Sequence, residues 1–217
     1  MEKLTVRRLS CDACKAADIP GVMERNGVVY NRISCVNWGE AYPYLPSVEF
    51  AIAHTSDRLL LHYRVEEQSV RAVARHDNEN IWEDSCVEFF ISPVEDGIYY
   101  NVECNCAGHL LVGGGRVNPD RVRSELSVMG AIDRWASLGS TPFDTIEGKT
   151  HWEVALVIPV STFFMHDVAR LDGRVMRANF YKCGDKLPVP HFVSWAPIVT
   201  DRPNFHCPEF FGEVVME

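Results

Sequence analysis

The stretch that most constrains the fold is Asn80–Pro93, in which a loop carrying a tryptophan leads directly into a β-strand. Alternation along this strand separates two sets of side chains onto opposite faces, Val87, Phe89 and Ile91 on one and Cys86, Glu88 and Phe90 on the other. Burying an unpaired carboxylate costs several kcal/mol, so Glu88 needs hydrogen-bonding partners or a ligand. Trp82 lies just outside the strand, where a flat aromatic ring suits stacking on a ligand or packing at a sheet edge.

A second strand follows after the turn signal Asp96-Gly97, and it carries a polar face. Its alternation over residues 98–105 groups four hydrogen-bonding side chains, Tyr99, Asn101, Glu103 and Asn105. Such a row is typical of a solvated sheet face, and it equally suits a ligand rich in hydroxyl groups. The two strands together therefore predict a hairpin.

Short alternating stretches separated by turns recur along the whole chain, and helical periodicity is almost absent. The predicted strands are 48–53, 59–65, 68–74, 85–92, 98–105, 109–112, one around Trp135, 150–159, 177–183 and the last residues of 205–215. This pattern predicts an all-β protein, an antiparallel β-sandwich formed by residues 1–217 as a single domain. Residues 1–45 are expected to be an irregular N-terminal extension laid over the core.

The predicted core of the sandwich draws on two of these strands, and a short helix is expected at about residues 160–166. The core residues are Val87, Phe89, Ile91, Trp152, Leu156 and Ile158. A hydrophobic content of 47% and a charged content of 24% are ordinary for a globular protein.

The net charge of −9 disfavours a nucleic-acid partner, because phosphate binding relies on clustered lysine and arginine. No apolar run approaches the roughly 18 residues of a membrane helix, so no membrane partner is expected. Residues 1–8 lack the apolar middle of a secretory signal, so the chain as written is expected in the cytoplasm. The alternative is a periplasmic or secreted location, if the sequence is a trimmed form of an exported protein.

The eight cysteines show no repeated paired spacing, and most are expected to be reduced core thiols. Cys11 and Cys14 form a lone C-x-x-C motif, for which zinc binding or redox chemistry is an alternative that would require further ligands. The histidines show no metal-ligand spacing. No cofactor is required by any of these patterns.

Three segments resemble one known family in their order along the chain. Residues 82–91 resemble the tryptophan-containing strand of family 9 carbohydrate-binding modules, residues 152–159 are similar to a later strand of that family, and residues 208–214 are similar to its closing strand. The resemblance extends from about residue 45 to the end. It implies an immunoglobulin-like or DOMON-like two-sheet sandwich that binds the end of an oligosaccharide or polysaccharide without catalysis, in support of glycan breakdown and in possible association with a glycoside hydrolase.

The resemblance also implies a set of ligand-binding residues. Two tryptophans would grip the terminal sugar, Trp82 by direct match and Trp195 by its place in the late loop, and polar side chains would contact the hydroxyls. The expected polar residues are Glu88, Arg71, Asn101, Glu103 and Asn179. Arg71 is alternatively an ion-pair partner of Glu88, and either tryptophan is alternatively a packing residue. Family members carry structural calcium in acidic loops, for which Asp57, Asp77, Glu79 and Asp84 are the acidic residues available.

Two other functions are alternatives to carbohydrate binding. Glu88 and Glu103, on neighbouring strands, could be the acid and the nucleophile of a glycoside hydrolase. DOMON-type domains hold haem for electron transfer, and candidate ligands are Met23, Met129, Met165 and Met176. The identity of the sugar is not predicted, because side-chain geometry rather than spacing reads the stereochemistry of the ring.

Overall fold

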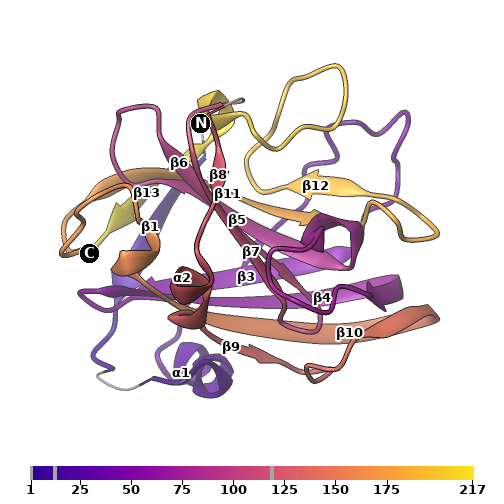
Figure 1. Ribbon diagram of the computed structural model, residues 1–217, viewed down its shortest axis with the longest axis horizontal. Coiled ribbons are helices and arrows are strands. Elements are labelled where there is room, and N and C mark those ends of the chain that lie inside the picture. Colours follow the sequence, from indigo (N-terminus) through magenta and orange to yellow (C-terminus); the bar gives the residue numbers. More distant parts are fainter. Residues whose placement is uncertain (1, 12–13, 118–119) are drawn as a thin grey trace.

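The computed structural model describes residues 2–11, 14–117 and 120–217, and these residues form two packed β-sheets with few helices. In Figure 1 one sheet occupies the lower half of the molecule and the other crosses above it. The upper sheet, sheet A, has the order β8 (Val122–Arg123), β7 (Leu110–Gly115), β6 (Tyr99–Asn105), β5 (Cys86–Ser92), β11 (Val175–Cys183), β13 (Gly212–Met216) and β1 (Lys3–Arg8). The lower sheet, sheet B, has the order β1, β3 (Ser47–His54), β4 (Arg58–Ala72), β10 (Phe143–Pro159) and β9 (Asp133–Ala136).

Two short strands lie off these paths, and β1 connects the sheets. β12 (Phe192–Ser194) pairs with β11, and β2 (Asn31–Arg32) pairs with β3. β1 pairs in parallel with β13 through its first half and in parallel with β3 through Arg7 and Arg8. The predicted β-sandwich is confirmed, but the sheet is mixed rather than purely antiparallel. Parallel neighbours need long connections. β1 is separated from β3 by residues 9–46 and from β13 by most of the chain.

Residues 1–45, expected as an irregular extension, contain regular elements that belong to the sandwich. β1 lies between the two sheets, and α1 (Ile19–Arg25) packs on the outer face of sheet B at the bottom of Figure 1. Ile19 and Met23 of α1 are fully buried against Leu60 and Val157. A short 3-10 helix, η1 (Ala16–Asp18), precedes α1. Turn signals in the sequence concealed these elements because each is only a few residues long.

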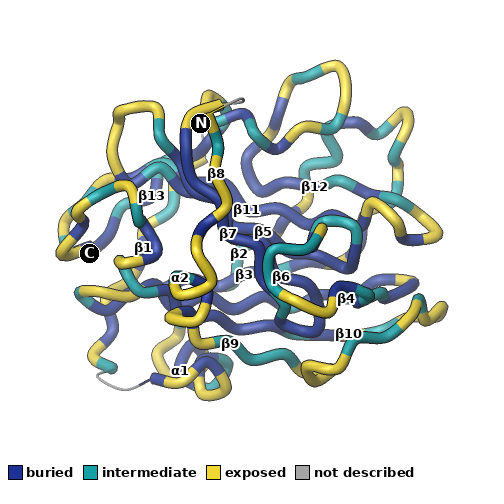
Figure 2. Tube along the Cα trace, in the orientation of Figure 1, coloured by how far each residue is buried: buried dark blue, intermediate teal, exposed yellow. Residues whose placement is uncertain are grey.

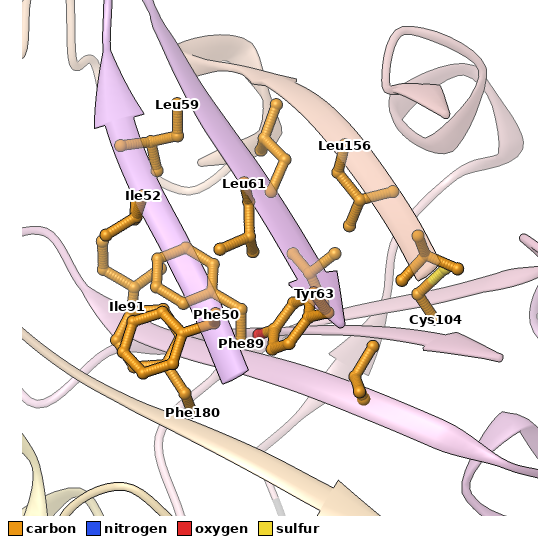
Figure 3. Packing of buried hydrophobic residues seen from close by; sticks show 14 of the residues in the cluster. Phe50, Ile52, Leu59, Leu61, Tyr63, Phe89, Ile91, Cys104, Leu156 and Phe180 are labelled. Carbon is orange, nitrogen blue, oxygen red and sulfur yellow. The ribbon is translucent and has the colours of Figure 1, made fainter. Parts of the chain in front are cut away.

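The main core lies between the sheets and is rich in aromatic rings (Figure 3). Phe180 of β11 stacks on Phe50 of β3 with ring centroids 3.7 Å apart, and it stacks on Phe89 of β5 at 5.0 Å. The six core residues expected from the sequence are all buried here, namely Val87, Phe89, Ile91, Trp152, Leu156 and Ile158. Facing strands therefore meet through the apolar faces that alternation assigns to them.

β4 is one continuous strand, although the sequence predicts two strands at 59–65 and 68–74. Glu66 and Glu67 lie between the two predicted strands, and β4 pairs with β10 on both sides of them. Glu67 is tolerated inside the sheet because its carboxylate lies 2.8 Å from the ammonium of Lys182, and both side chains are fully buried. A paired charge thus replaces the apolar residue that the strand pattern would require.

The outer face of sheet A is also buried, by loops rather than by a third sheet (Figure 2). The loop before β3 and the loop after β12 lie side by side there, since the Trp38 indole nitrogen donates a hydrogen bond to the Thr200 carbonyl at 2.8 Å. The remaining short elements are α2 (Leu126–Gly130) and the 3-10 helices η2 (Ile81–Glu83), η3 (Val160–Thr162) and η4 (Pro208–Phe210). η3 occupies the place of the helix expected at 160–166.

The cysteines divide into one pair and six free thiols. Cys11 and Cys14 form a disulfide, so this motif does not consist of the reduced thiols expected for most cysteines. The free cysteines are Cys35, Cys86, Cys104, Cys106, Cys183 and Cys207. Among the described residues, no helix is long and apolar enough to span a membrane.

Candidate functional site

A cleft with a volume of about 460 Å³ opens on the outer face of sheet A. Its floor comes from β5, β6, β7 and β11, and its walls come from β8 and from the loops around residues 82, 185 and 192–206. The lining combines aromatic rings with charged and amide groups: Trp82, Phe90, Phe192, Phe205, Glu88, Glu103, Asp185, Asn101, Asn204, Arg121, Arg123 and His206. Four residues expected to bind the ligand, Trp82, Glu88, Asn101 and Glu103, are therefore brought together here.

The floor of the cleft is the polar face of the β5–β6 hairpin. Glu88 and Glu103 stand opposite each other in the register of the two strands. One oxygen of Glu103 accepts a hydrogen bond of 2.9 Å from the Asn101 amide, whose own oxygen accepts one from Arg121. Gly113 leaves room for this arrangement, since a Cβ at that position would lie 2.6 Å from the Asn101 oxygen. The second oxygen of Glu103 is buried without a hydrogen-bond partner among the described residues.

The acidic groups of the cleft hold their protons more tightly than free carboxyls do. Burial, reinforced by the neighbouring charge of Glu103, raises the pKa of Glu88 well above its ordinary value. Burial raises the pKa of Glu103 to about 7 and that of Asp185 to about 6. Glu88 therefore favours its protonated form, and Glu103 populates both forms near neutral pH. A protonated carboxyl can donate as well as accept hydrogen bonds.

Trp82 stands on one wall because the loop before β5 is tied firmly to β4. It belongs to η2, and the buried Asp84 that follows accepts hydrogen bonds of 3.0 Å from the backbone nitrogens of Val73 and Ala74. Asp84 also accepts from the Asn105 amide at 3.0 Å. The guanidinium carbon of Arg123 lies 5.9 Å from the centre of the Trp82 ring. The indole is thus a half-buried plane on a well-supported loop.

The wall formed by the chain after β11 carries two phenylalanines, Phe192 and Phe205, rather than a second tryptophan. Phe205 is stacked on Tyr181 of β11 with ring centroids 4.2 Å apart and an interplanar angle of 6°. Phe192 lies at the start of β12, and Trp38 from the N-terminal segment packs against both phenylalanines. Residues 1–45 therefore help to support this wall.

The rim next to β8 carries the positive charge of the cleft. Arg121 lies over the face of Tyr99 at 3.8 Å and donates hydrogen bonds to the backbone oxygens of Tyr99 and Gly115. His206 contacts the Tyr99 hydroxyl at 2.9 Å, and burial together with the charge of Arg121 lowers the pKa of His206 to about 4. A neutral imidazole and a fixed guanidinium thus flank the polar floor.

Trp195 does not reach the cleft, which corrects the expectation that it faces Trp82. Its side chain is 9% exposed and packs edge-on against Phe50 and Phe180 in the main core. The physical reason is the pairing of β12 with β11. This pairing continues past β12 as a hydrogen bond from the backbone nitrogen of Trp195 to the backbone oxygen of Phe180, and it directs the indole inward. The alternative of a packing residue describes Trp195.

Asn179 and Arg71 also lie outside the cleft lining. The Asn179 side chain is fully buried and exchanges two hydrogen bonds with the backbone of Ala196, at 2.9 and 3.0 Å. The Arg71 guanidinium lies 3.2 Å from Asp84 rather than beside Glu88. Both residues fix loops around the sandwich: Asn179 holds the chain after β12, and Arg71 joins the network that anchors the Trp82 loop.

Sequence reasoning missed several residues of the cleft, notably Arg121, Arg123, Asp185, Phe192 and Phe205. The arginines lie in residues 116–149, which have no clear periodicity, and β8 has only two residues. Their signal is the Arg-Val-Arg alternation at 121–123, which places both arginines on one side of a strand. The phenylalanines lie in a proline-rich loop, whose course depends on the contacts described above.

Two of the acidic residues considered for calcium form ion pairs with arginine, and the methionines considered for haem lie outside the cleft. Asp77 lies 2.7 Å from Arg134, and Asp84 pairs with Arg71 as described. Met23, Met129 and Met176 are buried in the packed clusters, and Met165 lies on the surface. None of these methionines is among the residues that line the cleft.

The fold is a β-sandwich with a cleft lined by aromatic and polar side chains. The model of carbohydrate-binding family 9 matches residues 17–216, and the chain belongs to this family. A search of curated proteins returns no match.

Solved structures show the same fold at two levels of similarity. A candidate carbohydrate-binding protein from Bacteroides uniformis is 51% identical, with a TM-score of 0.98 over 100% of this chain and 99% of that one. A family 9 module from Caldicellulosiruptor kristjanssonii in complex with glucose is 13% identical, with a TM-score of 0.57 over 100% of this chain and 96% of that one. The same kind of module in complex with cellotriose is 12% identical, with a TM-score of 0.54, and covers 100% and 94%.

Proposed function

We propose that the chain binds the terminal sugar of a glycan in the cleft without cleaving it, in support of glycan breakdown. The observation that carries this proposal is the lining of the cleft, where aromatic planes surround a floor of hydrogen-bonding groups. A pyranose ring has apolar C–H faces edged by hydroxyls, so it needs both kinds of surface at once. Membership in carbohydrate-binding family 9 supports the same ligand class.

In this proposal the sugar ring lies against Trp82 on one side and the phenylalanines on the other. Glu88, Asn101 and Glu103 on the floor contact its hydroxyls, and Arg121 supports them from the rim. The grip thus uses one tryptophan with phenylalanine instead of two tryptophans. Glucose and cellotriose, bound by the related module, are the first probes to use.

The test is isothermal calorimetry on a glycan panel, run together with analysis of released reducing sugar. We expect saturable binding by the wild type, weaker binding by Trp82→Ala and Glu103→Gln, and no turnover. Trp135→Ala is the matched control, because Trp135 is also a partly buried indole but lies on β9 of sheet B. Binding that is the same in wild type and Trp82→Ala would contradict the proposal.

A glycoside hydrolase is the alternative that uses Glu88 and Glu103 as acid and nucleophile. Their opposite positions on β5 and β6 are compatible with such a pair. The electrostatics favour binding instead, because a nucleophile must be ionised and both pKa values are raised. Reducing sugar released by the wild type and lost in Glu88→Gln would establish the hydrolase. A haem absorption band in the purified protein would point to the electron-transfer alternative.

A further inference from the structure

Two buried thiols and a carboxyl group converge at the inner end of the cleft floor. Cys86 on β5 and Cys183 on β11 are paired in register, and Glu88 is the next residue on the same face of β5 as Cys86. Cys86, Cys183 and Glu88 are 0%, 1% and 3% exposed. One oxygen of Glu88 lies 3.1 Å from the Cys183 sulfur and 4.0 Å from the Cys86 sulfur, and the three ligand atoms lie within 4.8 Å of one another.

We propose that Cys86, Cys183 and Glu88 bind one thiophilic divalent cation, for which Zn²⁺ is the probe, with the fourth coordination position open to the cleft. Around tetrahedral zinc, with bonds of about 2.3 Å to sulfur and about 2.0 Å to oxygen, neighbouring ligand atoms lie roughly 3.5 Å apart. The two distances from Glu88 bracket that value, so the ligands need only small movements. Three protein ligands with one open position is the coordination of a zinc site that receives water or a ligand hydroxyl.

A second observation is an unpaired carboxyl oxygen in the same cleft. Glu103 stands opposite Glu88, is 4% exposed, lines the cleft, and has one carboxyl oxygen without a partner among the described residues. The ammonium of Lys182, the neighbour of Cys183, lies on the other face of the sheet, where it pairs with Glu67. The inner end of the cleft therefore gathers several potential anions, and the cations that line the cleft, Arg121 and Arg123, lie on its rim.

Ionisation of the site depends on the cation. Without it, burial raises the pKa of Cys86 to about 12 and raises the pKa of Cys183 and Glu88. Coordinated thiols and carboxyls are deprotonated by the charge of the metal ion, so binding releases the protons of both thiols and of the Glu88 carboxyl to solvent. Affinity should therefore increase as the pH rises. Access is through the cleft, because Cys183 and Glu88 both line it.

Cobalt(II) is the spectroscopic probe, because thiolate ligands give it intense charge-transfer absorption in the near ultraviolet. The full-length chain, freed of metal with a chelator, should develop this absorption and saturate at one Co²⁺ per chain, and Zn²⁺ should displace it. Cys86→Ala and Cys183→Ala should each abolish it. Glu88→Gln should weaken binding by more than the roughly 10- to 100-fold that loss of an outer-sphere contact costs.

Two controls separate this site from other thiols. Cys104→Ala removes a thiol that is equally buried but lies on the opposite face of the sheet, and it should keep the absorption. A Cys11→Ser/Cys14→Ser double variant removes the disulfide-bonded pair and should also keep it. Thermal melts of each variant, with and without Zn²⁺, show that it is folded and should show stabilisation by Zn²⁺ only where the site is intact.

The proposal is overturned if the folded wild type gives no sulfur-to-cobalt absorption, or if the absorption survives in both Cys86→Ala and Cys183→Ala. Loss of the absorption only in the Cys11→Ser/Cys14→Ser variant would likewise overturn it. The metal site shares Glu88 with the proposed glycan site, and the two proposals are tested by separate measurements. Calorimetry with glucose in the presence of chelator tests glycan binding alone, and cobalt titration without sugar tests the metal site alone.

Discussion

Glu88 and Glu103 face each other in register across β5 and β6, and their side chains are 3% and 4% exposed at the floor of the cleft. Burial raises the pKa of both carboxyls, to about 7 for Glu103, and the charge of Glu103 raises that of Glu88 further. A protonated carboxyl can donate a hydrogen bond to a sugar oxygen and accept one from a hydroxyl. The same pair therefore links the stability of the fold to the chemistry of its ligand site.

Glu103→Gln should change how stability depends on pH. Burial raises the pKa of Glu103 from an ordinary value of 4.5 to about 7, so the folded state binds more protons than the unfolded state between these pH values. The free energy of unfolding of the wild type therefore decreases as the pH rises from 4.5 to 7, by up to about 3 kcal/mol from this group. Glutamine does not titrate, so urea unfolding should show the variant gaining stability relative to the wild type over this window.

Glu95→Gln is the control for this measurement, because it removes an exposed carboxylate from the turn between β5 and β6. Its unfolding curves should follow those of the wild type at each pH. If the difference in stability between Glu103→Gln and the wild type were constant from pH 4.5 to pH 8, the raised pKa would be refuted.

Truncating Trp82 should chiefly weaken glycan binding, whereas truncating Trp195 should chiefly reduce the stability of the fold. Trp82→Ala should weaken glycan binding by about 1–3 kcal/mol, because it removes one wall of the cleft, and should have the smaller effect on unfolding. Trp195→Ala should cost about 3–5 kcal/mol of stability, because its ring fills the core beside Phe50 and Phe180. A thermal melt and a glycan titration on each variant distinguish the roles, and reversed results would assign the tryptophans the other way.

The sequence predicts most of this sandwich because alternation is a local property. Val87 and Glu88 lie on opposite faces of β5 in any extended chain, so the inner core and the cleft floor follow from the residue pattern. Trp195 could not be placed in the same way. The direction of its side chain depends on the pairing of β12 with β11. The sequence pattern does not predict this pairing, because a loop of irregular sequence joins the two strands. Arg121 likewise depends on a two-residue strand.

The sequence pattern also did not predict the buried ion pair between Glu67 and Lys182. Glu67 and Lys182 lie 115 positions apart, and each would be expected on a surface. In the fold they meet at 2.8 Å, and the Trp152 indole donates to the other oxygen of Glu67 at 2.7 Å. His191 accepts from the Lys182 ammonium at 2.8 Å, and burial lowers the pKa of His191 to about 2. Only the assembled sheets show that these groups lie together.

Breaking this buried ion pair should be strongly destabilising, whereas removing both charges should not. Lys182→Met leaves the Glu67 carboxylate in the sandwich without its counter-ion, at a cost of about 3–5 kcal/mol. In the double variant Lys182→Met/Glu67→Gln no unpaired charge remains, so much of the loss should be recovered. Urea unfolding of the two single variants and the double variant forms a thermodynamic cycle. Additive losses in that cycle would show that the two side chains do not interact.

Asp84→Ala should both destabilise the fold and loosen the ligand site, because one buried carboxylate holds the Trp82 loop against β4. The change removes the acceptor for the backbone nitrogens of Val73 and Ala74 and for the Asn105 amide. Leaving such buried donors without partners costs about 1–3 kcal/mol for each group, so the free energy of unfolding should fall by several kcal/mol.

Arg71→Gln is the matched control for Asp84→Ala. It removes only the ion pair with Asp84, and the Arg71 side chain is 22% exposed. Its effect on unfolding should be about 1 kcal/mol or less, since the carboxylate keeps its three hydrogen-bond donors. Glycan binding should follow the same order, weakened in Asp84→Ala and nearly unchanged in Arg71→Gln, because Asp84 positions the indole through the backbone. Equal losses of glycan affinity in the two variants would show that Arg71 itself contributes to the ligand site.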